Sequence, residues 1–310
     1  MTQAAALAAA ENNDDTRRAI GCFVLAIFLF AGMDTLIKYL SSGYPVAQLM
    51  FARSVVALVL VGGISVARGG WGGMRTRRPV AHVFRSLAGL LSMGCFFYAF
   101  RHLPLAEVYV LSFAGPLFIT ALSMPLLGEP VGWRRWAAVL VGFGGVVVMA
   151  RPEADAPLLP IAVGVAAAFF YALAMIAVRG LSRTESNTAI VVYLLLTTTV
   201  VSGVAAIPDW VWPGGFDLGL MLLVGTLGGA AQVLMTQAFR LGRAAVVAPF
   251  EYTGMIWATL LGFLVFGDVP TPTVLAGAGR FIGRGPVSYP PLQLPPRYPV
   301  CIAWAGGASR

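Results

Sequence analysis

Long apolar stretches alternate with short polar connections along most of the chain. A membrane-spanning helix needs about 20 mostly apolar residues, and stretches of roughly this length recur between residues 19 and 266. This pattern predicts an all-α polytopic membrane protein. A tenth helix is expected to begin near residue 270, after predicted helices at 19–40, 45–67, 80–100, 104–126, 133–150, 158–179, 187–207, 218–239 and 244–266.

The two halves of the chain are related by a repeat. Residues 99–129 align with residues 238–268 at a constant offset of 139, with nine identities in 31 positions. Both segments end in a glycine and an acidic residue, Glu129 in the first and Asp268 in the second. The offset aligns the first predicted helix with the sixth in sequence, so each repeat contains five helices. An odd number makes the copies cross the membrane in opposite directions, as in the inverted repeats of secondary transporters.

Basic residues orient these helices. If the N-terminus is cytoplasmic, twelve arginines fall on the inner side, and every inner connection carries at least two of them. The outer loops receive Arg101 and Arg151, or three basic residues if Lys38 is counted. By the positive-inside rule, the side of the membrane that carries more basic residues is the cytoplasmic side. The sequence therefore predicts a multi-pass protein of the inner (plasma) membrane with a cytoplasmic N-terminus.

The composition agrees with this class and narrows the chemistry. The chain is 58% apolar and 11% charged, whereas an ordinary soluble domain has about 25% charged residues. Its three cysteines and two histidines are scattered, with no CxxC motif. This pattern excludes a disulfide framework, a zinc site and Cys-His catalysis. We therefore expect no metal, no cofactor, no nucleic-acid partner and no enzymatic activity.

The ends of the chain differ in composition from the two repeats, which span residues 19–151 and 158–284. Residues 1–18 join an alanine run to charged residues and are predicted to form a disordered cytoplasmic tail. Six prolines between residues 286 and 299 cannot continue a helix, so the tenth helix is expected to be truncated or disrupted. Residues 285–310 are then an atypical Pro-rich tail. The abrupt change near Gly279 indicates either a shift of reading frame or a genuine divergent terminus.

Several short motifs stand out along the chain. They are Pro104-Leu-Ala-Glu-Val108, Phe113-Ala-Gly-Pro116, Leu127-Gly-Glu129, Gln237-Ala-Phe-Arg240 and Val247-Ala-Pro-Phe-Glu-Tyr252. Together with the two five-helix halves, they resemble the EamA-type branch of the drug/metabolite transporter superfamily. The resemblance covers about residues 19–279 and implies a ten-helix 5+5 inverted-repeat fold that carries amino acids, nucleotide-like metabolites, vitamins or drugs. The run from Phe30 to Leu40, followed by Phe51-Ala-Arg53, is similar to carriers for riboflavin and S-adenosylmethionine.

Charged residues within the predicted helices are candidates for a substrate site, because each costs about 2.5 to 3.5 kcal/mol on the insertion scale. Asp34 lies in the first helix and Lys38 follows at i+4, so the two share a face and can pair. One interpretation is a structural pair in which the two charges neutralise each other. The other is a functional pair in which substrate or a proton competes for one of the two residues. Arg53 in the second helix needs a carboxylate. It pairs with Asp34 or Glu107, or it contacts a substrate anion.

Glu251 is the strongest single candidate in the second half. It follows Pro249, and a proline frees a backbone carbonyl and suits a break in a helix that lines a cavity. A buried carboxyl group at such a break is the candidate for proton coupling. Tyr252 and Trp257 could stack on a flat ring, or they could face lipid and the protein core.

Four further polar residues have two open interpretations. Glu107 and Tyr109 lie near the outer start of the fourth predicted helix, where they either contact substrate or act as solvated interfacial residues. Gln232 and Thr236 share a face of the eighth helix at i, i+4. They offer uncharged hydrogen bonds either to substrate or to a neighbouring helix.

Taken together, these features predict a secondary carrier that moves a small organic metabolite (amino acid, vitamin or nucleotide-like compound) or a drug by alternating access. The expected partners are that substrate, protons and the lipid bilayer, and a homodimer is left open. Two other classes remain as alternatives. One is a non-transporting membrane scaffold, sensor or embedded enzyme, and the other is an inactive, frameshifted copy of a transporter.

Overall fold

The structure is a computed structural model that describes residues 3–67, 76, 78–127, 158–181, 184–241, 250–251 and 253–268. Its described elements are helices. The first half contains α1 (Gln3–Leu40), α2 (Val46–Ala67), α3 (Pro79–His102), α4 (Leu105–Ser112) and α5 (Ala114–Leu127). The second half contains α7 (Leu158–Leu181), α8 (Asn187–Ala206), α9 (Gly215–Leu241) and α11 (Thr253–Phe266).

Six of the described helices are long and apolar enough to cross a membrane. The prediction of a multi-pass membrane protein is confirmed at this level. Many large apolar side chains on these helices face outward, as expected for surfaces that contact lipid. The six spans are Asp15–Leu40, Val46–Ala67, Pro79–His102, Leu158–Leu181, Asn187–Ala206 and Gly215–Ala238.

The structure differs from the predicted helices in two places. Helix α1 begins at Gln3, where a disordered tail over residues 1–18 was expected, because the alanine run favours a helix. The predicted helix at 104–126 is divided into α4 and α5 by a turn at Phe113, whose N–H donates to Val110 O. Pro116 in the first turn of α5 has no N–H to continue the ladder of α4.

Some predicted features lie outside the described residues. These are the helix at 133–150, the start of the helix at 244–266, the disrupted tenth helix and the Pro-rich tail. The ten-helix 5+5 arrangement and the reading-frame hypothesis therefore stay predictions.

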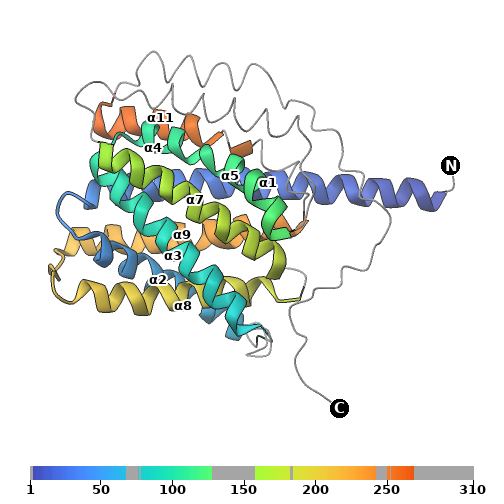
Figure 1. The fold of residues 1–310 in the computed structure, drawn as a ribbon, viewed down its shortest axis with the longest axis horizontal. Helices are drawn as coiled ribbons and strands as arrows, with labels where there is room; N and C mark the ends of the chain where they lie inside the picture. The colour runs from blue at the N-terminus through green and yellow to red at the C-terminus, as the bar shows by residue number, and fades with distance from the viewer. Residues whose placement is uncertain are drawn as a thin grey trace.

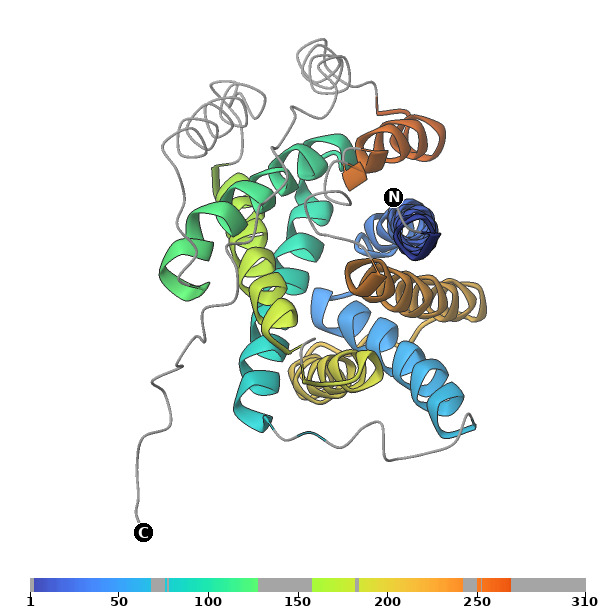
Figure 2. The same cartoon turned by 90° about the vertical axis from the view of Figure 1, so that its right-hand side faces the viewer.

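All the described helices except α5, which packs on α7, form a closed ring in which the two halves of the chain alternate. Round the ring, each helix packs on the next in the order α1, α9, α2, α8, α3, α7, α4 and α11, and α11 packs back on α1. Every one of these contacts joins a helix of the first half to a helix of the second half. Figure 1 shows the helices along their length, and Figure 2 shows the ring with α1 nearly end-on. Neither half could close the ring alone.

Glycines allow the helices of this ring to approach closely. A Cβ atom on Gly225 of α9 would collide with Val56 of α2, and a Cβ on Gly229 would lie 3.1 Å from Ala57 Cβ. In a membrane, small residues at a helix–helix contact permit the close packing that drives association. The α2–α9 contact therefore depends on the absence of side chains on α9.

This contact can be tested with the substitution Gly225→Ala. The added methyl group forces α2 and α9 apart, and overpacking of this kind costs about 1–3 kcal/mol. Gly219→Ala on the same helix is the control, because a Cβ there meets nothing within 4 Å. We expect a lower melting temperature of the purified protein for Gly225→Ala only. Equal melting temperatures for both variants would contradict the packing argument.

Candidate functional site

Asp34 and Tyr109 form the centre of a polar cluster inside the ring. Asp34 lies on α1 and is 8% exposed. The hydroxyl of Tyr109 on α4 donates a hydrogen bond of 2.8 Å to its Oδ2. Since α1 and α4 are not neighbours round the ring, side chains that join them meet in its interior. Tyr109 is thus the hydrogen-bond partner of a buried carboxyl group.

Arg53 of α2 brings a positive charge to the same cluster. Its side chain is 5% exposed, and its charge interacts with Asp34. The guanidinium donates through Nε to Met33 Sδ at 3.1 Å and through Nη1 to Met93 Sδ at 2.7 Å. Thioether sulfur is a weak acceptor, so these bonds hold the guanidinium loosely compared with a carboxylate. The predicted pairing of Arg53 with Asp34 is electrostatic, and strong acceptors from a ligand could still displace the sulfurs.

Two glycines make room for this cluster. A Cβ on Gly228 of α9 would lie 2.8 Å from Arg53 Nε, and a Cβ on Gly254 of α11 would lie 2.8 Å from Tyr109 Cε1. Both distances are shorter than real Cβ contacts allow. The positions of Arg53 and Tyr109 therefore depend on glycines, which have no side chain, in the second half of the chain.

Glu251 extends the cluster toward α7. It is half-buried just before α11 begins. Its carboxyl group interacts electrostatically with the hydroxyls of Tyr109 and of Tyr171 on α7. The cluster therefore contains an acid from each half of the chain, Asp34 and Glu251, and Tyr109 is electrostatically linked to both.

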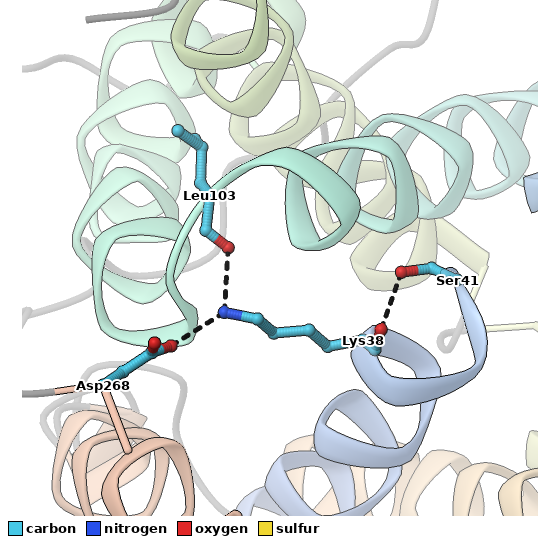
Figure 3. Close-up of polar contacts among 4 residues, drawn as sticks. All are labelled: Lys38, Ser41, Leu103 and Asp268. Atoms are coloured by element: carbon cyan, nitrogen blue, oxygen red, sulfur yellow. Dashed lines mark hydrogen bonds and ion pairs between the residues drawn. The ribbon is translucent and has the colours of Figure 1, made fainter. Parts of the chain in front are cut away.

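Lys38 does not pair with Asp34, although the i, i+4 spacing allows it. Figure 3 shows that its Nζ points to the end of α11, where it forms an ion pair of 2.8 Å with Asp268 Oδ2. The same Nζ donates to Leu103 O at 3.3 Å. The interaction thus joins α1, α11 and the connection between α3 and α4 at one end of the ring. The prediction that Lys38 neutralises Asp34 is wrong, because Asp34 turns inward to Tyr109.

The C-terminus of α11 positions Asp268 for this contact. Gly267 has a φ of +70°, and its N–H donates to Phe263 O at 3.0 Å. This left-handed cap ends the helix and favours glycine. The N–H of Asp268 then donates to Gly262 O at 3.2 Å, which turns the chain back over the helix end. The Gly-acid ending noted in the sequence is therefore a helix cap that presents a carboxylate.

The other predicted site residues are less directly involved. Thr236 is buried on α9, and its hydroxyl donates to the backbone oxygen of half-buried Gln232 at 2.7 Å. Trp257 packs edge-on against Phe28, with ring centroids 4.8 Å apart. Glu107 is half-buried in the first turn of α4. Tyr252 lies outside the described residues.

Sequence reasoning missed two charged positions on α3. Arg85 is 3% exposed, and its charge interacts with Tyr171. His82 Nε2 lies 3.7 Å from Glu185 Oε2 near the N-terminal end of α3, whereas Leu103, which accepts from Lys38, follows the C-terminal end of α3. The rule that singled out Arg53, a charge within a predicted helix, applies equally to Arg85 in the helix at 80–100. The pairing of His82 with Glu185 has no such local signal, because the two residues are a hundred positions apart.

Residues 17–151 and 158–282 each match the model of the EamA-like transporter family, which together is more than half of the chain. The chain belongs to the EamA-like transporter family. This confirms the resemblance suggested by the sequence motifs. The match occurs twice, once in each half of the chain.

Curated relatives of this EamA-like chain are transporters by name. An S-adenosylmethionine uptake transporter of Rickettsia bellii is 29% identical over 84% of this chain and 89% of its own. A pseudopaline exporter of Pseudomonas aeruginosa is 31% identical over 82% of this chain and 89% of its own. A riboflavin transporter of Vibrio cholerae is 31% identical over 82% of this chain and 86% of its own. These names support a small-molecule transporter of the drug/metabolite superfamily.

One solved crystal structure shares the fold of this EamA-like chain. It superposes with a TM-score of 0.65 at 22% sequence identity, and the match covers 86% of this chain and 94% of the other. At this identity the likeness concerns the fold alone.

The Asp34–Tyr109 hydrogen bond can be tested with Tyr109→Phe. Removing the hydroxyl leaves a buried carboxyl group without its donor, which costs about 1–3 kcal/mol. We expect a lower melting temperature of the purified protein. Tyr39→Phe is the matched control, because the side chain of Tyr39 on the same α1 helix as Asp34 is 49% exposed. A Tyr109→Phe variant as stable as Tyr39→Phe would show that the bond contributes little.

Proposed function

We propose that this chain is an inner-membrane secondary carrier that moves a small organic metabolite by alternating access. The observation that carries the proposal is the polar cluster of Asp34, Arg53, Tyr109 and Glu251 inside an apolar ring. Charged groups within membrane-spanning segments are costly and are retained where they bind substrates or ions. A protein that needed only a stable helix bundle would gain by replacing them with apolar side chains.

The alternation of the two halves supports a carrier mechanism. Inverted repeats supply two near-equivalent packings around one site, and the site opens to each side of the membrane in turn. Here both halves contribute to the cluster, with Asp34 and Tyr109 from the first and Glu251 from the second. A relative movement of the halves would change the surroundings of a bound substrate. The N-terminus is placed in the cytoplasm by the distribution of arginines.

The residues of the cluster have distinct proposed roles. Arg53 binds an electronegative group of the substrate, because its present acceptors are two thioether sulfurs that a stronger acceptor would displace. Asp34 accepts hydrogen bonds from polar groups of the substrate, and the Tyr109 hydroxyl donates a hydrogen bond to one of them. Glu251 takes up and releases the coupling proton, since a partly buried carboxyl group that interacts electrostatically with two phenols, and has no ion-pair partner among the described residues, is a suitable proton carrier.

The substrate class follows from the relatives and the cluster. The relatives are named as transporters of three different small molecules, S-adenosylmethionine, pseudopaline and riboflavin. The cluster, with its acidic, basic and phenolic groups, suits such a molecule. We therefore propose an amino-acid-like, vitamin-like or nucleotide-like compound.

The ion pair between Lys38 and Asp268 closes one end of the ring in this proposal. The side chains of the two residues are 17% and 35% exposed. A partly exposed pair of this kind contributes about 1 kcal/mol or less. Such a contact is strong enough to favour a closed end and weak enough to break in each transport cycle.

The role of Glu251 can be tested with Glu251→Gln. The amide cannot exchange a proton, so we expect the loss of substrate uptake driven by a pH gradient in proteoliposomes, with no change in folding. The substrate is first selected from a panel that includes S-adenosylmethionine, riboflavin and amino acids. Asp209→Asn is the control, because Asp209 is exposed in the connection between α8 and α9. Unchanged transport in Glu251→Gln would remove Glu251 from the mechanism, and no flux of any compound would refute the carrier proposal.

The closing contact can be tested by reversing its charges. Lys38→Asp and Asp268→Lys each place like charges together, so we expect each single variant to transport several-fold more slowly than the wild type. The double variant restores an attractive pair and should recover most of the rate. A double variant that is as slow as the product of the two single effects would show that the ion pair has no role in transport.

A further inference from the structure

Arg85 is a buried charge outside the cluster described above. It lies seven residues into α3 and is 3% exposed, and its Nε has no hydrogen-bond partner. Its guanidinium folds back along its own helix toward Gly89, where a Cβ atom would collide with Nη1. The same Cβ would lie 2.8 Å from Leu194 Cδ1 of α8. The side chain therefore occupies a space between α3 and α8 that exists because residue 89 is a glycine.

The surroundings of Arg85 are rich in unused donors. Ser86 beside it is fully buried, and its Oγ has no partner. One turn earlier, His82 Nδ1 makes no hydrogen bond, whereas His82 Nε2 lies 3.7 Å from Glu185 Oε2. Positions 82, 85, 86 and 89 share one face of a helix. Donors concentrated on one face without acceptors are unusual in a folded protein, since buried polar groups are normally satisfied.

No acidic side chain supplies a direct counter-charge in the interactions that the structure gives for Arg85. Its guanidinium interacts with the hydroxyl of Tyr171 on α7, which is a neutral group. An arginine stays protonated even when buried, and a buried charge without an anion is costly. The charge of Glu251 also acts on Tyr171, so this phenol is electrostatically linked to both Arg85 and Glu251.

We propose that Arg85 binds a negatively charged group of the substrate, either a carboxylate or a phosphate. The guanidinium would donate charge-assisted hydrogen bonds to the anion, and the hydroxyls of Ser86 and Tyr171 would be further donors. The rest of the substrate then extends toward Asp34 and Arg53. This inference rests on the proposed carrier function, and it defines the substrate as a compound with an anionic group at one end.

The test measures binding rather than transport. The full chain is purified and reconstituted in phosphatidylcholine nanodiscs, and its melting temperature is recorded against sodium acetate and sodium phosphate at constant ionic strength. We expect the melting temperature to rise with anion concentration and to reach a plateau for at least one of the two anions. In Arg85→Gln, the apparent Kd for that anion should rise at least tenfold. Arg101→Gln is the control, because Arg101 is exposed at the other end of α3.

Two more variants separate binding from folding. Gly89→Ala keeps the charge of Arg85 but displaces its guanidinium, so the anion response should weaken as in Arg85→Gln. Gly94→Ala is the control, because a Cβ there meets Met50 at an ordinary 3.5 Å. Arg85→Lys keeps a charge without the guanidinium fork and should retain a weakened response. Without anion, Arg85→Gln should melt no lower than the wild type, whereas a structural role for Arg85 predicts a lower melting temperature.

Four outcomes of the binding test would overturn the proposal, and one outcome of a transport assay would do so as well. The first is the absence of any saturable response to either anion, and the second is an unchanged response in both Arg85→Gln and Gly89→Ala. The third is a lower melting temperature of Arg85→Gln without anion. The fourth is a response to phosphatidylglycerol in the nanodisc but to neither free anion, which would identify a lipid headgroup as the ligand. Transport of a substrate without any anionic group would leave the carrier function intact and refute only the role of Arg85.

Discussion

The charged side chains inside the ring can be stabilised only by one another and by a few polar neighbours, because the helices around them are apolar. This constraint explains several separate features of the structure. Tyr109 donates to Asp34, two methionine sulfurs accept from Arg53, and Glu251 interacts electrostatically with Tyr109 and Tyr171. The glycines beside Arg53 and Tyr109 keep the space in which these contacts form. A cluster satisfied by weak acceptors and neutral donors is well suited to exchange its partners for those of a substrate.

The interleaving of the two halves turns this cluster into a site that a conformational change can alter. Each helix of the ring has neighbours from the other half of the chain, so any movement of one half against the other changes the contacts on every side. The ends of the ring carry polar contacts, the partly exposed ion pair of Lys38 with Asp268 at one end and the buried side chains of His82 and Glu185, 3.7 Å apart, at the other. A weak ion pair at one end of the ring and costly buried charges in its centre are consistent with a carrier.

Much of the fold and part of the site could be predicted, for identifiable physical reasons. The hydropathy pattern locates most of the described helices, because lipid demands about 20 apolar residues per span. The cost of burying charge singles out Asp34, Arg53 and Glu251, which the structure brings into one cluster. The same cost applies to Arg85, a charge within the predicted helix at 80–100. The wrong pairing of Lys38 with Asp34 has a different cause, since spacing along one helix gives the possible partners but not the direction in which each side chain turns.

The sequence by itself determined the class of protein, the approximate positions of the spanning helices and the family, because these depend on local composition and on motifs within single segments. Only the tertiary structure decided which charges meet. Asp34 finds Tyr109 at a separation of 75 residues, and Lys38 finds Asp268 at a separation of 230. Such pairings depend on how the halves interleave round the ring, and on glycines in one half that admit side chains from the other. No local pattern contains that information, because the free energy of each contact depends on partners from distant parts of the chain.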